Sequence, residues 1–327
     1  MRLVIMGTGT FAEPTLEALL AGPHPVVGLV TQPDRAAGHE RGSTRQIGKG
    51  MKSIAQEKDI PVFQPESINT PEGVAKLKEW GAELLVVAAY GQILSKDVLE
   101  AAPHGGINVH ASLLPKYRGA APVAWAIYHG ETRTGVTIIR MTTGLDAGDM
   151  LAQEALAIMP EETAGELEAR LAPLGTRLAC RVIEQIATGT AHGIKQDKSQ
   201  VTKAPKLKKE DGLIDWSRSA VDVCNQVRAM QPWPTAYTFL HRQGQGAQRV
   251  IVNRTGKSMI MPSGPSHYAP GSGLLFGQQD TLWVATGQHG AIQVLELQPA
   301  GKKRMTAAEF LRGHPIRQGD HFGPESA

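Results

Sequence analysis

The sequence predicts an α/β protein with two domains, a Rossmann-like doubly wound parallel sheet followed by a smaller OB-like β-barrel. In the first half of the chain, apolar runs typical of strands alternate with helical stretches. One of these runs, Leu84 to Ala89, is unbroken, as in a strand that is buried on both faces of a sheet. In the last third, short β runs are separated by glycines. The length of 327 residues allows a hydrophobic core for each domain.

The first domain is expected over residues 1–189. A long helix is predicted from about Glu162, where Thr163 and Glu166 form a capping box, to about Gly189. The alternation implies right-handed crossovers and a parallel sheet, whose ligands bind beyond the carboxyl ends of the strands. The predicted strands are Leu3–Met6, Val26–Thr31, Val62–Phe63, Leu84–Ala89, Ile107–Val109 and Val136–Arg140, and the shorter predicted helices are Pro14–Leu20, Met51–Lys58 and Pro71–Trp80.

A lysine-rich segment separates this region from the second domain. Residues 190–209 are expected to form a basic linker, with six lysines and one aspartate between Lys195 and Lys209. The OB-like domain is expected over residues 210–318, and residues 319–327 are expected to be a tail. The Gly- and Pro-rich segment from His314 onward is expected to be loosely ordered. The predicted helices of the OB-like domain are Val221–Met230 and a short helix that is capped by Thr306 and Glu309. Its predicted strands are Ala236–His241, Arg249–Asn253, Gly273–Phe276, Thr281–Ala285 and Ala291–Leu297.

The composition is that of an ordinary soluble globular protein, with 41% hydrophobic and 20% charged residues. A net charge of +3 does not by itself indicate nucleic acid. Cys180 and Cys224 form no disulfide framework and lack the spacing of zinc ligands. The first apolar run is broken by Gly7 and Gly9 and is too short for a signal peptide or a membrane span. We therefore expect a cytoplasmic monomer that holds no metal and binds neither membranes nor DNA.

The first strand is followed by a glycine pattern that resembles a dinucleotide fingerprint. Residues 7–12 read Gly-Thr-Gly-Thr-Phe-Ala and match G-x-G-x-x-A between a strand and a helix. A nicotinamide dinucleotide also needs an acidic residue at the end of the second strand, to bind the ribose. That strand ends Val30-Thr31-Gln32, and the first acid, Asp34, falls in the following loop. The sequence therefore disfavours a dehydrogenase.

Residues 106–119 carry the strongest functional pattern, Gly-Ile-Asn-Val-His-Ala-Ser-Leu-Leu-Pro-Lys-Tyr-Arg-Gly. Side chains of a strand alternate between its faces, so Asn108 and His110 point the same way. Pro115 and Gly119 keep the following segment from becoming helix. An amide donor beside an imidazole suits the stabilisation and protonation of a reacting carbonyl. On spacing alone, a strand end with two polar residues facing water stays an equal alternative.

This run, together with Gly-Leu-Asp-Ala-Gly-Asp at residues 144–149, resembles the folate-dependent formyltransferases, and the resemblance extends over nearly the whole chain. It implies that the formyl group of 10-formyltetrahydrofolate is carried to an amine and that Asn108, His110 and Asp146 form the catalytic trio. It further implies a folate site bordered by two segments, whose residues are Ser112, Leu113, Leu114, Pro115, Tyr90, Gly91, Gln92 and Ile93.

The expected chemistry is direct attack of the amine on the formyl carbon, through a tetrahedral oxyanion. A preorganised donor at that oxygen lowers the barrier by about 3–4 kcal/mol in comparable acyl-transfer sites. Asn108 can donate its amide hydrogen, and His110 can donate as well or move the proton from the amine to the folate nitrogen. Asp146 would orient the imidazole. The formyl donor is already activated, so no covalent enzyme intermediate is required.

The acceptor amine is indicated by other segments. The family member that acts on glycinamide ribonucleotide lacks a second domain, which leaves the members that formylate methionine on initiator tRNA and those that formylate sugar nucleotides. A basic loop that begins Gln-Pro-Asp-Arg at residue 32 favours tRNA, and within it Arg41 is the preferred contact. The loop departs from the usual family pattern at Ala36, His39 and Glu40. The expected tRNA-binding residues are Arg35, Arg41, Arg45, Lys49, Lys206, Lys208 and Lys209.

Overall fold

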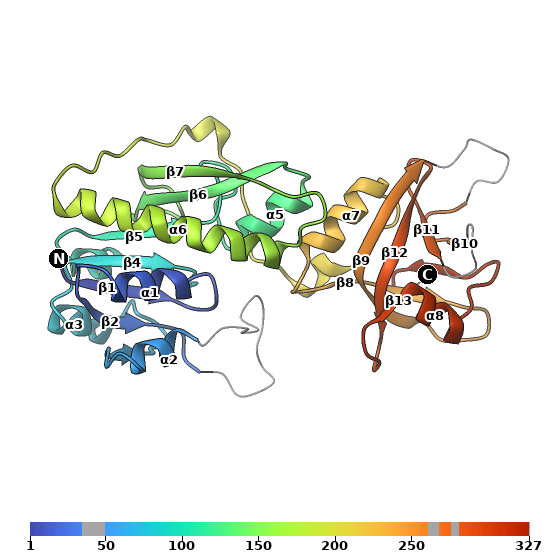
Figure 1. Ribbon diagram of the computed structural model, residues 1–327, viewed down its shortest axis with the longest axis horizontal. Helices are drawn as coiled ribbons and strands as arrows, with labels where there is room; N and C mark the ends of the chain where they lie inside the picture. Colours follow the sequence, from blue (N-terminus) through green and yellow to red (C-terminus); the bar gives the residue numbers. More distant parts are fainter. Residues whose placement is uncertain (35–49, 261–267, 276–280, 327) are drawn as a thin grey trace. The chain divides into compact units, whose positions relative to one another are not determined.

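The structure, a computed structural model, describes residues 1–34, 50–260, 268–275 and 281–326 (Figure 1). The chain divides into two compact units. Unit 1 consists of Met1–Ala126, Thr132–Met159 and Gly165–Lys206, and unit 2 of Ile127–Glu131, Pro160–Ala164 and Leu207–Ala327. The predicted class is confirmed, because unit 1 is built on a mainly parallel α/β sheet and unit 2 on an antiparallel barrel.

The sheet of unit 1 has the strand order β3-β2-β1-β4-β5-β6-β7. Its first five strands are parallel, as the sequence predicts, whereas β6 and β7 run antiparallel to their neighbours. β7 was not predicted, because its sequence MLAQEALA is made mostly of good helix formers and is largely exposed. The strands are β1 (Leu3–Gly7), β2 (Val26–Val30), β3 (Val62–Phe63), β4 (Leu84–Ala88), β5 (Gly106–His110), β6 (Arg133–Arg140) and β7 (Met150–Ala157).

Helices of unit 1 pack against the sheet through apolar faces. One core cluster joins Val4, Met6 and Val87 of the sheet to Leu77 and Val98 of two helices. The longest helix, α6 (Ala164–Ala187), approaches β5 so closely that a Cβ on Gly175 would lie 2.7 Å from Val109 Cγ1. The other helices are α1 (Glu13–Leu20), α2 (Met51–Gln56), α3 (Pro71–Glu79), α4 (Lys96–Glu100) and α5 (Pro122–Tyr128), of which α4 and α5 were not predicted.

Unit 2 is a nearly closed antiparallel sheet with the order β10-β11-β12-β9-β8-β14, to which β13 adds beside β12. A bridge between Ser272 and His321 brings the two ends of this order together. No helix among the described residues is long and apolar enough to cross a membrane. The elements are α7 (Ala220–Ala229), β8 (Ala236–His241), β9 (Gln248–Ile260), β10 (Gly273–Leu275), β11 (Leu282–Thr286), β12 (Gly290–Pro299), β13 (Met305–Thr306), α8 (Ala307–Gly313) and β14 (His321–Gly323).

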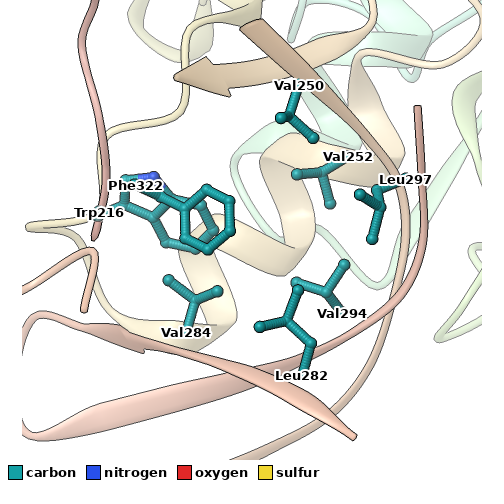
Figure 2. Close-up of a pocket in the computed structure, with 8 residues that line it drawn as sticks. All are labelled: Trp216, Val250, Val252, Leu282, Val284, Val294, Leu297 and Phe322. Atoms are coloured by element: carbon teal, nitrogen blue, oxygen red, sulfur yellow. The ribbon is translucent and has the colours of Figure 1, made fainter. Parts of the chain in front are cut away.

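The end of the chain contains an ordered strand, β14, where the sequence predicts a loosely ordered tail. The barrel interior explains this difference. Phe322 of β14 lies in the apolar interior beside Trp216, with ring centroids 6.1 Å apart (Figure 2). Thr238 accepts a hydrogen bond from the Trp216 indole at 2.9 Å and donates one to the Gly323 carbonyl at 3.0 Å. The segment is therefore ordered by a buried aromatic ring, although its glycine and proline content is typical of a loose end.

Glu168 on α6 gives the fold a pH dependence. Burial raises the pKa of its carboxyl from 4.5 to about 7, so the folded state binds the proton more tightly than the unfolded chain. The contribution of Glu168 to stability is thus fully present below the unfolded value of 4.5 and is lost as the pH rises through about 7. We expect Glu168→Gln to stabilise the protein by roughly 1–2 kcal/mol at about pH 8 and to leave its stability unchanged at about pH 4.

Thermal unfolding at both pH values measures this difference. Glu17→Gln, at an exposed position of α1, serves as the control and should shift Tm equally at the two pH values. An equal gain for Glu168→Gln at the two pH values would contradict the assignment of the buried carboxyl.

Candidate active site

Asn108 and His110 leave the carboxyl end of β5, in the interior of the sheet. β5 lies between β4 and β6, which place Val87 and Ile139 on either side of Asn108. The Asn108 side chain is half-buried, and His110 is only 5% exposed. A polar pair at this depth requires hydrogen-bond partners, because an unpaired buried donor or acceptor costs about 1–3 kcal/mol.

The Asp146 carboxylate supplies one partner for the pair. Its Oδ1 accepts a hydrogen bond of 3.2 Å from Asn108 Nδ2, and its Oδ2 lies 3.6 Å from His110 Nδ1. Oδ2 also accepts a bond of 2.8 Å from the Gly119 backbone amide. The structure therefore brings together the three residues that the sequence singles out, although 36 residues separate His110 from Asp146.

The contact of the second ring nitrogen, Nε2, determines the tautomer of neutral His110. Nε2 lies 2.9 Å from the Tyr117 carbonyl oxygen. A carbonyl oxygen accepts and never donates, so Nε2 carries the hydrogen and donates it. In the neutral ring, Nδ1 then holds the lone pair and is the nitrogen that takes up a proton. The nearby Asp146 carboxylate stabilises the positive charge that this protonation creates.

Asn108 keeps one donor for a substrate. Its amide nitrogen carries two hydrogens, of which one is directed at Asp146. The second can be offered to a carbonyl oxygen. Together with Nδ1 of His110, the arrangement combines a fixed hydrogen-bond donor and a proton carrier at one strand end. Such a site can stabilise an oxyanion and transfer a proton in the same step.

Residues that the sequence analysis did not single out complete the surroundings of the trio. Gln196 donates from Nε2 to the carbonyl oxygens of Asp146, at 2.7 Å, and Gly148, at 2.8 Å. Thr202 accepts a 2.8 Å hydrogen bond from the Tyr117 amide. Both residues belong to the segment 190–209, which the sequence predicts to be a basic linker. No local pattern marks them, because their partners are distant in the sequence.

The residues expected to border the folate differ in exposure. Ser112, Leu114 and Tyr90 are buried, and the Ser112 hydroxyl donates to the Lys116 carbonyl at 2.7 Å. Burial raises the pKa of Tyr90 to about 12, so its hydroxyl stays protonated. Gln92 bonds the backbone of the 66–68 segment through both of its amide atoms. Three members, Gly91, Ile93 and Leu113, keep surface that a flat ligand could contact, and Pro115 is half-buried.

The glycine turn after β1 serves close packing. A Cβ on Gly7 would lie 2.8 Å from both Ala12 Cβ and the Ala88 carbonyl oxygen. Asp34, the first acid after β2, pairs with Lys52 and accepts a 2.9 Å hydrogen bond from Gln64. These hydrogen bonds hold the pKa of Asp34 below its usual value. This carboxylate is therefore engaged within the protein, in keeping with the sequence-based argument against a dinucleotide.

The expected tRNA contacts divide into two groups. Arg35, Arg41, Arg45 and Lys49 lie outside the described residues. Lys206, Lys208 and Lys209 are exposed. Within the described ranges, no group of three or more histidine, cysteine, aspartate or glutamate side chains is arranged to hold a metal ion.

Comparison with known proteins gives matches over most of the chain. The family model described as Formyl transferase matches residues 1–183, and the one described as Formyl transferase, C-terminal domain, matches residues 206–315. Methionyl-tRNA formyltransferase from Geobacter sulfurreducens is 44% identical over 99% of this chain and 97% of its own length. The same enzyme from Solibacter usitatus is 45% identical over 99% of each chain.

Solved structures share the fold at lower identity. An N-formyltransferase from Helicobacter canadensis, in complex with folinic acid and dTDP-3-aminofucose, has a TM-score of 0.64 and 18% identity, covering 89% of this chain and 98% of the other. A sugar 3N-formyl transferase, solved in the presence of dTDP and 5-N-formyl-THF, has a TM-score of 0.63 and 16% identity, covering 93% of this chain and 99% of the other.

The hydrogen bond to Tyr117 predicts the tautomer of His110. When the ring is neutral, its hydrogen should reside on Nε2 and its lone pair on Nδ1. Nitrogen NMR of protein labelled in its histidines distinguishes the two ring nitrogens, and a His110→Gln variant identifies the resonances. His104, which is exposed, gives the reference for a ring without this constraint. A hydrogen on Nδ1 of neutral His110 would contradict this assignment of the tautomer.

Proposed function

The chain belongs to the methionyl-tRNA formyltransferase family, and we propose that it transfers the formyl group of 10-formyltetrahydrofolate to the α-amino group of methionine on initiator tRNA. The observation that carries this function is the 44–45% identity to such enzymes over 99% of the chain. The enzyme is a transferase that uses a folate cosubstrate and a tRNA substrate. The sugar formyltransferases that share the fold are only 16–18% identical.

We call the connection between β6 and β7 the Asp146 loop. In the proposed mechanism, the formyl carbon lies between this loop and the end of β5. The methionine amine attacks this carbon, a C–N bond forms, and the formyl oxygen becomes an oxyanion. The second amide hydrogen of Asn108 stabilises that oxygen without changing the charge of the side chain. Nδ1 of His110 accepts the proton that the amine loses and returns it to the folate nitrogen as the old C–N bond breaks. The protein therefore ends each cycle in its starting protonation state.

The fixed charge in this mechanism is the Asp146 carboxylate. It bonds the amide of Asn108 and the backbone of Gly119, so its position is set before substrates arrive. While His110 holds the transferred proton, the ring is positive and lies 3.6 Å from Oδ2. Attraction between these charges stabilises the protonated intermediate in a site shielded from water. Asp146 thus acts on the reaction through the other two residues.

The folate is proposed to lie against two segments, 90–93 and 112–115. Ile93 is 56% exposed, so its aliphatic side chain is accessible to a ligand. Leu113 keeps part of its surface, and apart from its chain neighbours no described residue comes within 4 Å of where a Cβ on Gly91 would stand. An apolar slot with exposed backbone suits a flat pterin ring, which needs stacking surface and a few hydrogen bonds. The buried residues Tyr90, Ser112 and Leu114 would support this slot from behind.

The tRNA is proposed to contact the lysines at the junction where unit 1 ends and unit 2 begins along the chain. Lys206, Lys208 and Lys209 are exposed, and no ion pair is found for them among the described residues. Free cations of this kind bind phosphates and contribute affinity without reading sequence. The basic segment 35–49 is proposed to make further contacts near the acceptor end, with Arg41 as the preferred residue.

The acceptor decides between this function and that of the sugar formyltransferases. The protein is incubated with 10-formyltetrahydrofolate and either methionyl-initiator tRNA or an amino-sugar nucleotide. We expect formyl-methionyl-tRNA to form and no formylated sugar nucleotide to accumulate. Uncharged initiator tRNA, which has no methionine amine, is the control. Formylation of the sugar nucleotide without formylation of the tRNA would overturn the proposed function.

The roles of Asn108 and His110 predict the kinetics of their variants. Asn108→Ala removes the oxyanion donor and should lower kcat by about 10²–10³-fold. His110→Ala removes the proton carrier and should lower kcat by about 10²–10⁴-fold. The Kd for methionyl-tRNA should stay within about twofold in both, because neither side chain is proposed to bind the tRNA body. Steady-state kinetics and a filter-binding titration measure the two quantities.

His104→Ala is the matched control for these variants. His104 lies just before β5 and is exposed. Its substitution should leave kcat unchanged. Near-normal kcat in both Asn108→Ala and His110→Ala would show that the trio does not catalyse the transfer.

A further inference from the structure

The segment between α6 and unit 2 is built into the candidate active site. We call residues 193–204 the strap. At its start, the backbone of Ile194 pairs with that of Met150 by two hydrogen bonds of 2.8 and 2.9 Å. At its end, Ala204 donates from its amide to the Arg118 carbonyl at 2.7 Å, and Thr202 accepts from the Arg118 amide at 2.9 Å. The strap therefore joins the first residue of β7 to the loop that follows β5.

The middle of the strap meets the loop that carries Asp146. The Gln196 amide nitrogen donates to the Asp146 and Gly148 carbonyl oxygens, at 2.7 and 2.8 Å. The Gln196 oxygen accepts from two nitrogens of the Arg118 guanidinium, at 3.1 and 2.7 Å. One half-buried side chain thus uses its donors and its acceptor on two segments of the site.

The Asp146 loop needs such support because its own structure holds it weakly. Residues 142–145 and Ala147 are exposed, so the loop buries little apolar surface. Asp146 adopts a φ of +46°, which a residue with a Cβ adopts only at a cost. The carboxylate bonds fix the side chain, but they do not fix the carbonyl on the other side of the residue. Gln196 is the described side chain that bonds that carbonyl.

We propose that Gln196 is a positioning residue for formyl transfer, which holds the Asp146 loop so that the carboxylate reaches Asn108 and His110. This inference rests on the proposed function of the trio. Gln196 touches neither substrate nor the reacting atoms and acts only through the loop. The same strap also orders Tyr117, whose carbonyl fixes the His110 ring, through the bond from the Tyr117 amide to Thr202.

Two substitutions separate loop positioning from the contact with Arg118. Gln196→Ala removes both. Gln196→Glu keeps an acceptor for the guanidinium but cannot donate to the two carbonyls, and its charge repels them. If Gln196 acts through the Asp146 loop, both variants lose activity. If it acts only by pairing with Arg118, Gln196→Glu stays close to wild type.

The experiment measures kcat and KM for methionyl-tRNA and for 10-formyltetrahydrofolate in the full-length protein. We expect Gln196→Ala and Gln196→Glu to lower kcat by roughly 10- to 100-fold, as for a catalytic group displaced by about 1 Å, with both KM values within about twofold of wild type. Gln200→Ala is the matched control, since Gln200 is an exposed strap glutamine whose amide bonds only Asp197 among the described residues. It should have wild-type kinetics.

A double-mutant cycle tests whether Gln196 works through the carboxylate. In an Asp146→Ala background there is no carboxylate to position, so Gln196→Ala should lower single-turnover rates no further. An equal fold-loss in both backgrounds would overturn the proposal, as would wild-type kcat in Gln196→Glu or an unaltered kcat with raised KM in Gln196→Ala. Because two substitutions are compared, poor folding of one leaves the other to decide.

The same assay separates this inference from the proposed function. If the wild-type protein formylates methionyl-tRNA and the Gln196 variants match it, the positioning role alone is wrong. If the wild-type protein forms no formyl-methionyl-tRNA, the proposed function is wrong and the inference falls with it.

Discussion

The Asp146 carboxylate is the constraint on which the geometry of the candidate active site depends. Its two oxygens bond a side chain of β5 and a backbone amide of the following loop, and they face the His110 ring. A carboxylate can serve three neighbours in this way because it only accepts and has about four lone-pair directions. Asn108 and His110 form one site with Asp146 because the chain brings this carboxylate back to the end of β5.

To place Asp146 at the end of β5, segments of backbone must lie very close together. This closeness restricts which residues fit at the points of contact. A Cβ on Gly148 would lie 1.7 Å from the Arg140 carbonyl oxygen, so only glycine fits there. Gly119, whose amide bonds Asp146, has a φ of +130°, and its Cβ would lie 2.3 Å from the Ala204 carbonyl oxygen. One glycine of each motif, Gly119 and Gly148, is thus explained by a close contact, with the strap and with β6 respectively. They do not require a role in binding substrate.

The sequence predicts what depends on local pattern and misses what depends on distant pairing. The buried strands β1, β2 and β4 are apolar runs, so their positions could be predicted directly from the sequence. The sequence does not indicate that β6 runs antiparallel to β5, because the alternation of side chains along a strand is the same in either direction. Asn108 and His110 could be found from strand periodicity, and Asp146 was found by its place in a family motif. Gln196 could not, because it lies 50 residues beyond its partner in a segment whose lysines suggest a solvated linker.

The strap lies between the residues that are proposed to act on the formyl group and the described lysines that are proposed to bind tRNA. All residues proposed to touch the formyl group, and those that position them, lie between Asn108 and Ala204 in unit 1. The described lysines proposed for tRNA begin two residues later, at Lys206. The strap bonds the Asp146 loop through Gln196, and ten residues further along the chain it is followed by Lys206. The segment that holds the proposed catalytic loop is therefore continuous in sequence with the lysines that are proposed to bind tRNA.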